Sequence, residues 1–359
     1  MNLEYRDFLD IALGGTVLGT GGGGSYETAE HLAKTHLRRK SVKLVSLGTV
    51  ASRARIIAIA GMGSPEAMLK RPFATEARNA FDALTRDFVD DVKYVIPIET
   101  SGFNFLTPMT VAATRAVTVI DADPAGRAIP QLNMTLFYAA GISLAPLALA
   151  DAGGRSVTIR GSDYALSEKA AISALESFGW SAGLACYPML GTAAKRATVF
   201  GTISLARAVG IALRSAVETG ADPLGAVLEV TGGRELMRGT VDRFESETAG
   251  SYKFGTLELR GKDGNRGRTA RVKSMNENMI AWKDDRLAAV APDRICFLTP
   301  DGRPITNADI TSGDELAVFL VEAQSPWKSR KTSGLFPSTL GAMGYRGPYI
   351  AIRDLPHGD

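Results

Sequence analysis

The acidic residues that follow predicted strands are the first candidates for chemistry. Glu99 comes directly after an expected strand at 93–98, Asp121 ends the next expected strand, and Asp123 lies two residues further on. Crowded carboxyl groups either share a proton, which provides a general acid and a general base near neutral pH, or hold a divalent cation. A third interpretation stays open, in which these are solvated loop acids and Asp121 or Asp123 pairs with Arg127.

Amide side chains lie close in sequence to acidic ones at two places. Asn104 follows Glu99 in a polar loop, and the run Asn276-Glu277-Asn278 lies in an otherwise apolar segment. Two amides beside a carboxylate can orient a planar, amide-like ligand, although the same residues also shape turns. Asn104 and Glu277 are therefore catalytic candidates together with the three acids above.

Glycine is the strongest deviation in composition, with 38 residues in a chain of 359. Four of them are consecutive, at 21–24, and Ser25 follows as the expected N-cap of a helix. Such a run presents backbone N–H groups to a phosphate, a carboxylate or an oxyanion, whereas a purely conformational turn would need one or two glycines. Neither a complete Walker A motif nor a complete Rossmann fingerprint is present, so no ATP or NAD site is expected.

Further polar residues at the same expected sheet edge complete the predicted substrate contacts. Ser64 is the expected N-cap of a helix after the strand at 55–60, and Arg127 follows the acidic loop. The residues predicted to bind substrate are Thr20, Gly21, Gly22, Gly23, Gly24, Ser25, Ser64, Arg127, Asn276 and Asn278.

Cysteine and histidine are scarce, which limits the kinds of metal site and nucleophile. Two Cys and three His exclude a disulfide scaffold and a zinc site rich in Cys or His. A divalent metal ion, if one binds, would take oxygen ligands, and the candidates are Glu99, Asp121 and Asp123. Cys186 ends a predicted strand, where a role as a small buried apolar residue is favoured over a nucleophilic one.

The charge balance and the apolar segments bear on partners and location. The 41 basic and 38 acidic residues give a net charge of +3, so the totals carry no electrostatic footprint for nucleic acid. The N-terminal segment lacks the apolar core of a signal peptide, and the longest apolar stretch, 136–150, is too short to span a membrane. We expect a cytoplasmic protein with reduced thiols, a small-molecule substrate, no nucleic-acid or membrane partner, and assembly into homo-oligomers.

These side chains need a framework, and alternating strand-like and helical patterns predict an α/β domain. Short β-branched runs alternate with segments of helical spacing, which indicates a mixed or mostly parallel sheet covered by helices. The expected strands are 42–47, 55–60, 93–98, 117–121, 156–160 and 183–187, and the expected helices include 5–18 and 26–39. Loops at the carboxyl ends of parallel strands share one edge, which is where open α/β sheets bind ligands.

The last third of the sequence has a different pattern of residues. Short β-branched runs are separated there by Asp263-Gly264 and by Asp301-Gly302, and Asp-Gly between such runs is typical of hairpins. A final strand-like run lies at 349–353 and could pack on the first domain. The predicted division is an α/β domain over 1–234, a smaller β-rich domain over 235–327, and a tail over 328–359 that could complete the α/β domain.

Taken in order, several of these motifs resemble a known family. The chain carries Gly19-Thr-Gly-Gly-Gly-Gly24, Gly63-Ser-Pro65, Glu99 with Gly102 and Asn104, Asp121-Ala-Asp123 with Gly126-Arg127, and Asn276-Glu277-Asn278. As a set they resemble the S-methyl thiohydantoin desulfurase family over essentially the whole chain. The resemblance implies an N-terminal α/β domain, a β-rich C-terminal domain, and hydrolysis of an S-methyl thiohydantoin to a hydantoin and methanethiol.

The expected function is therefore that of a hydrolase acting on a five-membered cyclic imide or amidine-like ring. The predicted roles are water activation by Asp121, Asp123 or Glu99, directly or through a metal ion, ring orientation by Asn104, Asn276 and Glu277, and anion binding by 21–24 and Arg127. The competing hypothesis is a non-catalytic binding or accessory protein of a hydantoinase or oxoprolinase system.

Overall fold

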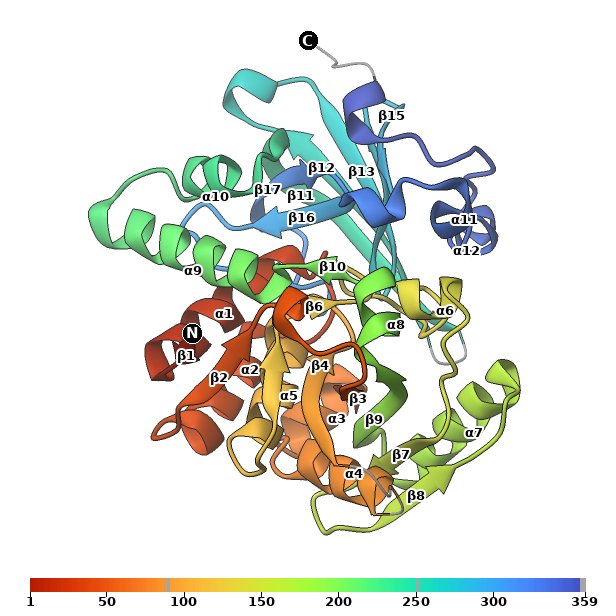
Figure 1. The fold of residues 1–359 in the computed structure, drawn as a ribbon. Coiled ribbons are helices and arrows are strands. Elements are labelled where there is room, and N and C mark those ends of the chain that lie inside the picture. The colour runs from red at the N-terminus through yellow and green to blue at the C-terminus, as the bar shows by residue number, and fades with distance from the viewer. Residues whose placement is uncertain (87, 89–90, 250–251, 356–359) are drawn as a thin grey trace.

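An eight-stranded mixed sheet forms the centre of the N-terminal part of the chain (Figure 1). The computed structural model describes residues 1–86, 88, 91–249 and 252–355. The strand order is β1 (Asn2–Leu3), β2 (Val42–Val45), β5 (Thr118–Ile120), β4 (Val92–Pro97), β3 (Arg55–Gly63), β9 (Ser181–Leu190), β7 (Leu147–Ala150) and β8 (Ser156–Ile159). Strands β2, β5, β4 and β3 run parallel and the other pairings of this sheet are antiparallel, which confirms the predicted mixed sheet.

The central strands of this sheet are buried on both faces. In β3, Ile57 and Ile59 pack into a core with helices on one side, whereas Ile56 and Ala58 face a second core. Because successive strand residues point to opposite faces, one continuous apolar run serves both cores. The second core also contains Trp327 from the C-terminal part, so the two parts of the chain share buried contacts.

Helices cover the sheet and precede the strands of the C-terminal part. Their bounds are α1 (Tyr5–Leu18), α2 (Tyr26–Leu32), α3 (Pro65–Lys70), α4 (Glu76–Thr85), α5 (Gly102–Ala112), α6 (Leu136–Ala139), α7 (Tyr164–Ser177), α8 (Gly191–Arg196), α9 (Thr202–Thr219) and α10 (Pro223–Thr231). The predicted helix at 5–18 is confirmed. The predicted helix at 26–39 starts at Tyr26 but continues from α2 as a π-helical segment, η1 (Ala33–Leu37), and ends two residues early.

A seven-stranded antiparallel sheet forms the centre of the C-terminal part. Its order is β15 (Arg286–Val290), β14 (Glu277–Lys283), β13 (Thr269–Met275), β12 (Tyr252–Gly261), β11 (Arg234–Ala249), β17 (Glu315–Val321) and β16 (Arg294–Leu298). Strand β11 begins at Arg234, where the pattern of residues in the sequence changes. Asp263-Gly264 connects β12 to antiparallel β13 through a 3-10 turn, η3 (Asp263–Asn265), inside a longer loop than a two-residue hairpin turn. A separate two-stranded sheet pairs β6 (Ala122–Asp123) with β10 (Val199–Phe200).

The tail forms short helices, and Phe336, Leu340 and Met343 join the second core together with residues of the first sheet. Its short helices are η4 (Ser325–Trp327), α11 (Arg330–Ser333), α12 (Pro337–Ala342) and η5 (Ile352–Asp354). The predicted strand at 349–353 is wrong, because the Asp293 carboxylate accepts hydrogen bonds from the Tyr349 hydroxyl at 2.8 Å and from the Ile352 N–H at 2.9 Å. Ile352 thereby joins the core of the C-terminal sheet rather than the first domain.

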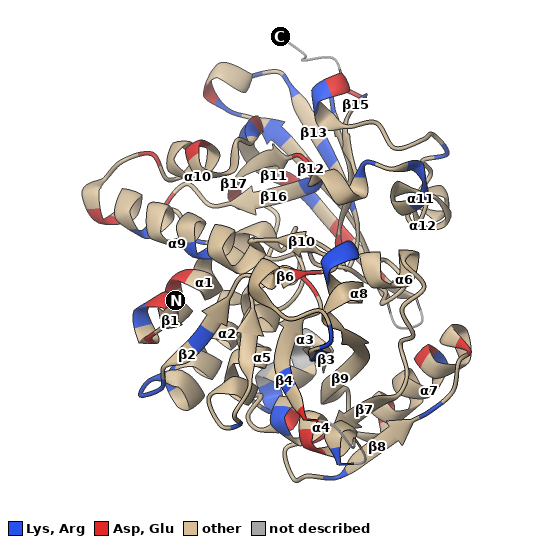
Figure 2. Cartoon of the chain, in the orientation of Figure 1, with Lys and Arg blue, Asp and Glu red and all other residues tan. Residues whose placement is uncertain are grey.

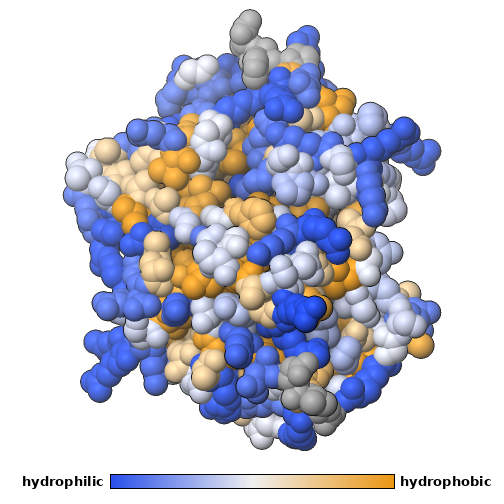
Figure 3. Space-filling view, in the orientation of Figure 1, coloured by the Kyte–Doolittle hydropathy of each residue, from blue (hydrophilic) through white to orange (hydrophobic). Residues whose placement is uncertain are grey.

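Acidic and basic residues are mixed along the chain in the view of Figure 2. Figure 2 shows Lys, Arg, Asp and Glu interspersed over both parts of the molecule. Figure 3 shows hydrophilic residues around the rim of the same view and hydrophobic residues gathered toward its middle. Within the described ranges, no helix has both the length and the apolar character needed to cross a membrane.

Candidate active site

A cavity of about 580 Å³ brings together residues of both sheets. One side is formed by the glycine run, the end of β3 and the segment that follows β4. The opposite side is formed by β11, β12, the β13–β14 turn and the loop at 306–309. The cavity therefore lies at the carboxyl ends of β3 and β4, where ligands of open α/β sheets bind, and the C-terminal sheet covers it.

The glycine run is held tightly against the C-terminal part. The carbonyl of Thr20 accepts a hydrogen bond from the Asn278 N–H, and the carbonyl of Gly21 accepts one from the Asn307 N–H, both at 2.8 Å. A Cβ atom on Gly22 would lie 2.2 Å from Oε1 of Glu277. Glycine at this position thus lets the Glu277 carboxyl group approach the backbone. The run therefore forms part of the cavity wall and also part of the domain seam, the buried interface between the N-terminal and C-terminal parts of the chain.

Glu99 is a buried carboxyl group with fixed orientation. Its Oε1 accepts a hydrogen bond from Nδ2 of Asn104 at 2.6 Å, and its Oε2 accepts one from the Ile129 N–H at 2.9 Å. Asn104 is itself oriented, because its Oδ1 accepts from the Gly61 N–H at 2.8 Å. Burial raises the pKa of Glu99 to about 7 even though these hydrogen bonds favour the charged form. Glu99 can therefore gain or lose a proton near neutral pH.

Glu277 enters the same cavity from the other sheet, at the start of β14. It is only 4 % exposed, and its Oε2 has no hydrogen-bond partner in the described part of the chain. Burial and repulsion from Glu99 raise the pKa of Glu277 well above its usual range, while the nearby charge of Arg127 lowers it. Two buried carboxyl groups that repel each other can share one proton, which would leave one as an acid and the other as a base.

The other two predicted acids lie outside the cavity. Asp123 is fully buried, and its carboxylate accepts hydrogen bonds from the Ala125 N–H at 2.7 Å and from Oγ1 of Thr100 at 2.8 Å. Burial raises its pKa as well. Asp121 caps helix α9, where its Oδ1 accepts from the N–H groups of Ile203 and Ser204, each at 3.0 Å. The charge of Asp123 still acts on Glu99 and raises its pKa, but of the three acids that the sequence places close together only Glu99 lines the cavity.

Arg127 lies at the domain seam rather than on the cavity wall. Its guanidinium donates to the carbonyl of Asp293 at 2.9 Å and to Oγ1 of Thr20 at 3.2 Å, and also to the carbonyl of Asn278. Burial lowers its pKa to about 10. The alternative in which Arg127 pairs with Asp121 or Asp123 is not seen, because its donors point to these other acceptors.

The remaining predicted binding residues divide between wall and seam. Asn276, with φ of 56°, lines the cavity while its Oδ1 accepts from the Lys253 N–H at 2.9 Å. Ser25 and Ser64 also line it and act as N-caps of α2 and α3, as predicted. Asn278 is buried and donates from Nδ2 to the carbonyl of Ile295, so together with Thr20 it belongs to the seam.

Several cavity residues were not among the predicted contacts. They are Gln131, Lys253, Tyr252, Glu168 and the segment 306–309. Asn307 donates from Nδ2 to the carbonyl of Asn276 at 2.8 Å, which orients the amide turn beside Glu277. The polar run Thr306-Asn-Ala-Asp309 is the only local feature of the sequence that indicates a binding role for this segment. Because the run lies far from Glu99 along the chain, the sequence does not show that both line one cavity.

The structure also bears on whether the described residues could bind a metal ion or provide a reactive thiol. Among the described residues, no group of three or more His, Cys, Asp or Glu side chains is arranged to hold a metal ion. Cys186 is a free thiol buried in β9, and burial raises its pKa. It does not line the cavity, which agrees with the expected apolar role.

Comparisons with known proteins agree with this architecture. Family models described as the S-Me-THD-like N-terminal and C-terminal domains match residues 6–161 and 162–352. A crystal structure of a protein from Chromobacterium violaceum is similar with a TM-score of 0.84 and 26 % identity, covering 98 % of this chain and 100 % of that one. A comparison with curated proteins finds no match. The two family matches together span nearly the whole chain, and the protein belongs to the S-Me-THD-like family.

Proposed function

We propose that this protein is a hydrolase of a cyclic imide or amidine-like ring, either an S-methyl thiohydantoin, which gives a hydantoin and methanethiol, or a related hydantoin. The observation that carries the proposal is the pair Glu99 and Glu277, buried in one cavity and contributed by two different sheets. Membership of the S-Me-THD-like family supports the thiohydantoin ring as the substrate class. The predicted cytoplasmic location and homo-oligomeric assembly are part of the same proposal.

The hydrogen bonds support different proposed roles for the two carboxyl groups. Asn104 and the Ile129 N–H donate to both oxygens of Glu99, which favours its ionised form and the role of base. Glu277 has an oxygen without a partner and lies close enough to Glu99 to feel its charge, so it carries the shared proton. This division provides one base and one acid in a site shielded from solvent.

The reaction can then proceed with both groups regenerated. Glu99 takes one proton from water as the oxygen adds to the ring carbon between the nitrogens, and Glu277 gives its proton to the ring nitrogen. The hydroxyl proton of the adduct then returns to Glu277 as the carbonyl forms and the C–S bond breaks. Methanethiol leaves with the proton that Glu99 had accepted. Asn276 and Asn307 lie beside this pair and can orient the ring amide groups.

The test is a methanethiol-release assay with a thiol-reactive dye. The dye reads product because Cys186 and Cys296 are both buried. We expect kcat to fall about 10²- to 10⁴-fold in Glu99→Gln and in Glu277→Gln, the usual range for loss of a general acid or base. Glu76→Gln is the matched control, since Glu76 is also 4 % exposed but lies on α4 and does not line the cavity.

Two results would contradict the proposal. Full thiol release by both cavity variants would remove the carboxyl pair from the mechanism. Calorimetric binding of thiohydantoins without any thiol release by the unmodified protein would instead favour the binding or accessory role.

A further inference from the structure

Asp123 does not line the cavity, but it is bonded to both of the segments that hold Glu99. Its carboxylate accepts a hydrogen bond from Oγ1 of Thr100 at 2.8 Å, and Thr100 is the residue that follows Glu99. The same carboxylate accepts from the Ala125 N–H at 2.7 Å and from the Gly126 N–H at 2.5 Å. One buried side chain therefore connects the segment after β4 with the segment after β6.

These two segments orient the Glu99 carboxyl group. The Ile129 N–H, in the segment after β6, donates to Oε2 of Glu99 at 2.9 Å. The two segments are also joined by their backbones, because the Thr100 N–H donates to the carbonyl of Arg127 at 3.2 Å. Since both segments are bonded to Asp123, its carboxylate helps to fix the position of Glu99 relative to the Ile129 donor.

The hydrogen bonds of Asp123 suit a charged carboxylate. The side chain is 0 % exposed, and it is the acceptor in each of the three bonds above. A protonated carboxyl group would need an acceptor for its own O–H. Burial raises the pKa of Asp123, whereas these donors lower it. The buried Arg294 guanidinium interacts electrostatically with Asp123 and has the opposite charge, which further favours the ionised form.

Asp123 is one of several charged groups around Glu99. Repulsion between Glu99 and Glu277 raises the pKa of Glu277, and the charge of Arg127 lowers it. The other titratable groups that line the cavity are Glu168, Tyr252, Lys253 and Asp309. Asp123 differs from all of these lining groups because it lies behind the wall, where a bound substrate does not contact it. Its charge raises the pKa of Glu99 from a fixed position.

We infer that Asp123 is a positioning residue for the reaction, which acts through Glu99 and does not touch the substrate. Its hydrogen bonds hold Glu99 at the cavity wall, and its negative charge makes Glu99 a stronger base. The inference rests on the proposed function for the role of Glu99 as base. The effect of Asp123 on the protonation of Glu99 does not depend on turnover and can be measured without it.

Asp123→Asn tests the charge, because it keeps the shape of the side chain. Carbon NMR of protein isotope-labelled at the glutamate side-chain carboxyl follows the titration of Glu99, whose signal is identified by its loss in Glu99→Gln. We expect the titration midpoint of Glu99 to fall by about one pH unit in Asp123→Asn. The acid limb of the kcat/KM profile for methanethiol release should move in the same direction by the same amount, because Glu99 must be ionised to act as the base.

Asp151→Asn is the matched control. Asp151 is also buried, at 6 % exposed, but its carboxylate is bonded to Arg155 and does not line the cavity. We expect the Glu99 midpoint to stay unchanged in this variant. An unchanged midpoint in folded Asp123→Asn overturns the inference even where thiol release is fully active. A shifted midpoint in a protein that releases no thiol supports the action of Asp123 on Glu99 and contradicts the proposed function alone.

Thr100→Val and Thr100→Ser test the positioning, and they decide the inference if Asp123→Asn does not fold. Valine removes the donor to Asp123, whereas serine keeps it. We expect kcat to fall at least about tenfold in Thr100→Val, since a small displacement of a catalytic group has an effect of this size, and to stay within about threefold in Thr100→Ser. Thermal unfolding confirms that both variants are folded. Equal kcat in Thr100→Val and the unmodified protein overturns the positioning role.

Discussion

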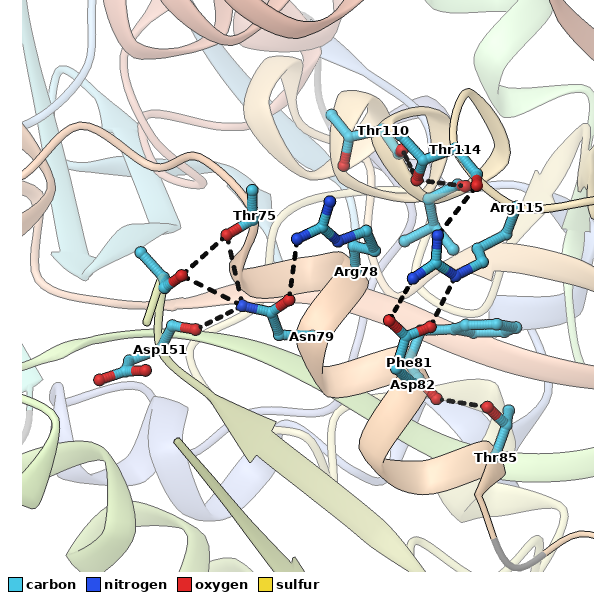
Figure 4. A network of polar contacts seen from close by, with 12 residues as sticks. Thr75, Arg78, Asn79, Phe81, Asp82, Thr85, Thr110, Thr114, Arg115 and Asp151 are labelled. Atoms are coloured by element: carbon cyan, nitrogen blue, oxygen red, sulfur yellow. Dashed lines mark hydrogen bonds and ion pairs between the residues drawn. The ribbon is translucent and has the colours of Figure 1, made fainter. Parts of the chain in front are cut away.

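Asp82 on helix α4 and Glu277 in the cavity are both carboxylates, but their surroundings are opposite. Asp82 accepts two hydrogen bonds from the Arg115 guanidinium, and its side chain is 37 % exposed (Figure 4). Asn79 on the same helix donates to the carbonyl of Asp151 at 2.8 Å and ties α4 to β7. Glu277 is almost fully buried and has an oxygen without a partner in the described ranges, and its pKa is raised by burial and by the charge of Glu99.

The difference shows which acidic groups serve the fold and which are available for chemistry. A carboxylate paired with arginine and exposed to water stays ionised and contributes little to stability, about 0–1 kcal/mol. A buried pair of like charge is costly to ionise and therefore binds a proton at neutral pH. Under the proposed function, this unfavourable burial is what makes the two carboxyl groups available for proton transfer.

The largest of these effects on kcat is expected from Gly22→Ala, which tests whether the buried Glu277 carboxyl group differs in role from the exposed Asp82. The new Cβ would lie 2.2 Å from Oε1 of Glu277, so the carboxyl group has to move. The clash involves a side chain rather than backbone, and we expect melting temperature to change little while kcat falls about 100-fold, since misplacement by about 1 Å costs this much. The measurement is thiol release alongside thermal unfolding.

Gly264→Ala is the control for this substitution, because no atom lies within 4 Å of the added Cβ. Unchanged kcat in Gly22→Ala would mean that the position of Glu277 does not matter for turnover. A large loss of stability together with unchanged kcat would mean that the glycine run serves the fold and not catalysis.

A smaller effect is expected from Glu277→Gln on the pH dependence of stability. Burial raises the pKa of Glu99 to about 7 in the folded protein, so the stabilisation from its protonated form is full below about pH 4 and is lost as pH rises through about 7. The pKa of Glu277 is also raised, by burial and by repulsion from Glu99, so Glu277 adds to this loss of stability at high pH, and Glu277→Gln removes its share. We expect the variant to be more stable than the unmodified protein by about 1–3 kcal/mol at pH 8, with the gain vanishing near pH 4.

Urea unfolding across this pH range measures the difference. A gain at pH 8 together with loss of thiol release would show that the pair is maintained for function at the expense of stability. Equal stability at every pH would mean that the two carboxyl groups do not interact in the folded protein.

The same contrast explains what the sequence could predict of the site. Glu99, Asn104 and Glu277 were singled out by their local patterns, and the structure places all three on the cavity wall. Their catalytic roles stay predictions. Asp121 has an equally suggestive pattern at the end of a strand, but it caps α9 through Ile203, whose place beside it depends on the tertiary fold. Local sequence shows that a carboxyl group is present, while its partners decide its role.

The fold was predictable where local signals and packing agree. The helix at 5–18 and the mixed sheet follow from periodic apolar residues that end at turn residues. The run at 349–353 has the composition of a strand, but Asp293 binds its Tyr349 hydroxyl and its Ile352 N–H and holds it outside any sheet. A distant side chain that takes up backbone groups cannot be read from a local pattern.

The smallest expected effect is that of Arg115→Ala, and it asks whether the two regions are independent. Arg115 follows α5, whose first turn carries Asn104 and hence the orientation of Glu99, so one helix links the two regions. The Asp82–Arg115 pair is more than one-third exposed at both side chains, and its loss should cost no more than about 1 kcal/mol of unfolding free energy. Because Glu99 is fixed by Asn104 and the Ile129 N–H at the opposite end of α5, kcat should stay within about twofold. Thermal unfolding and thiol release on the same sample check both values.

A tenfold fall in kcat without a loss of stability would show that α5 transmits changes at α4 to the carboxyl pair. The two regions would then not be independent, although their carboxyl groups have different hydrogen-bond partners.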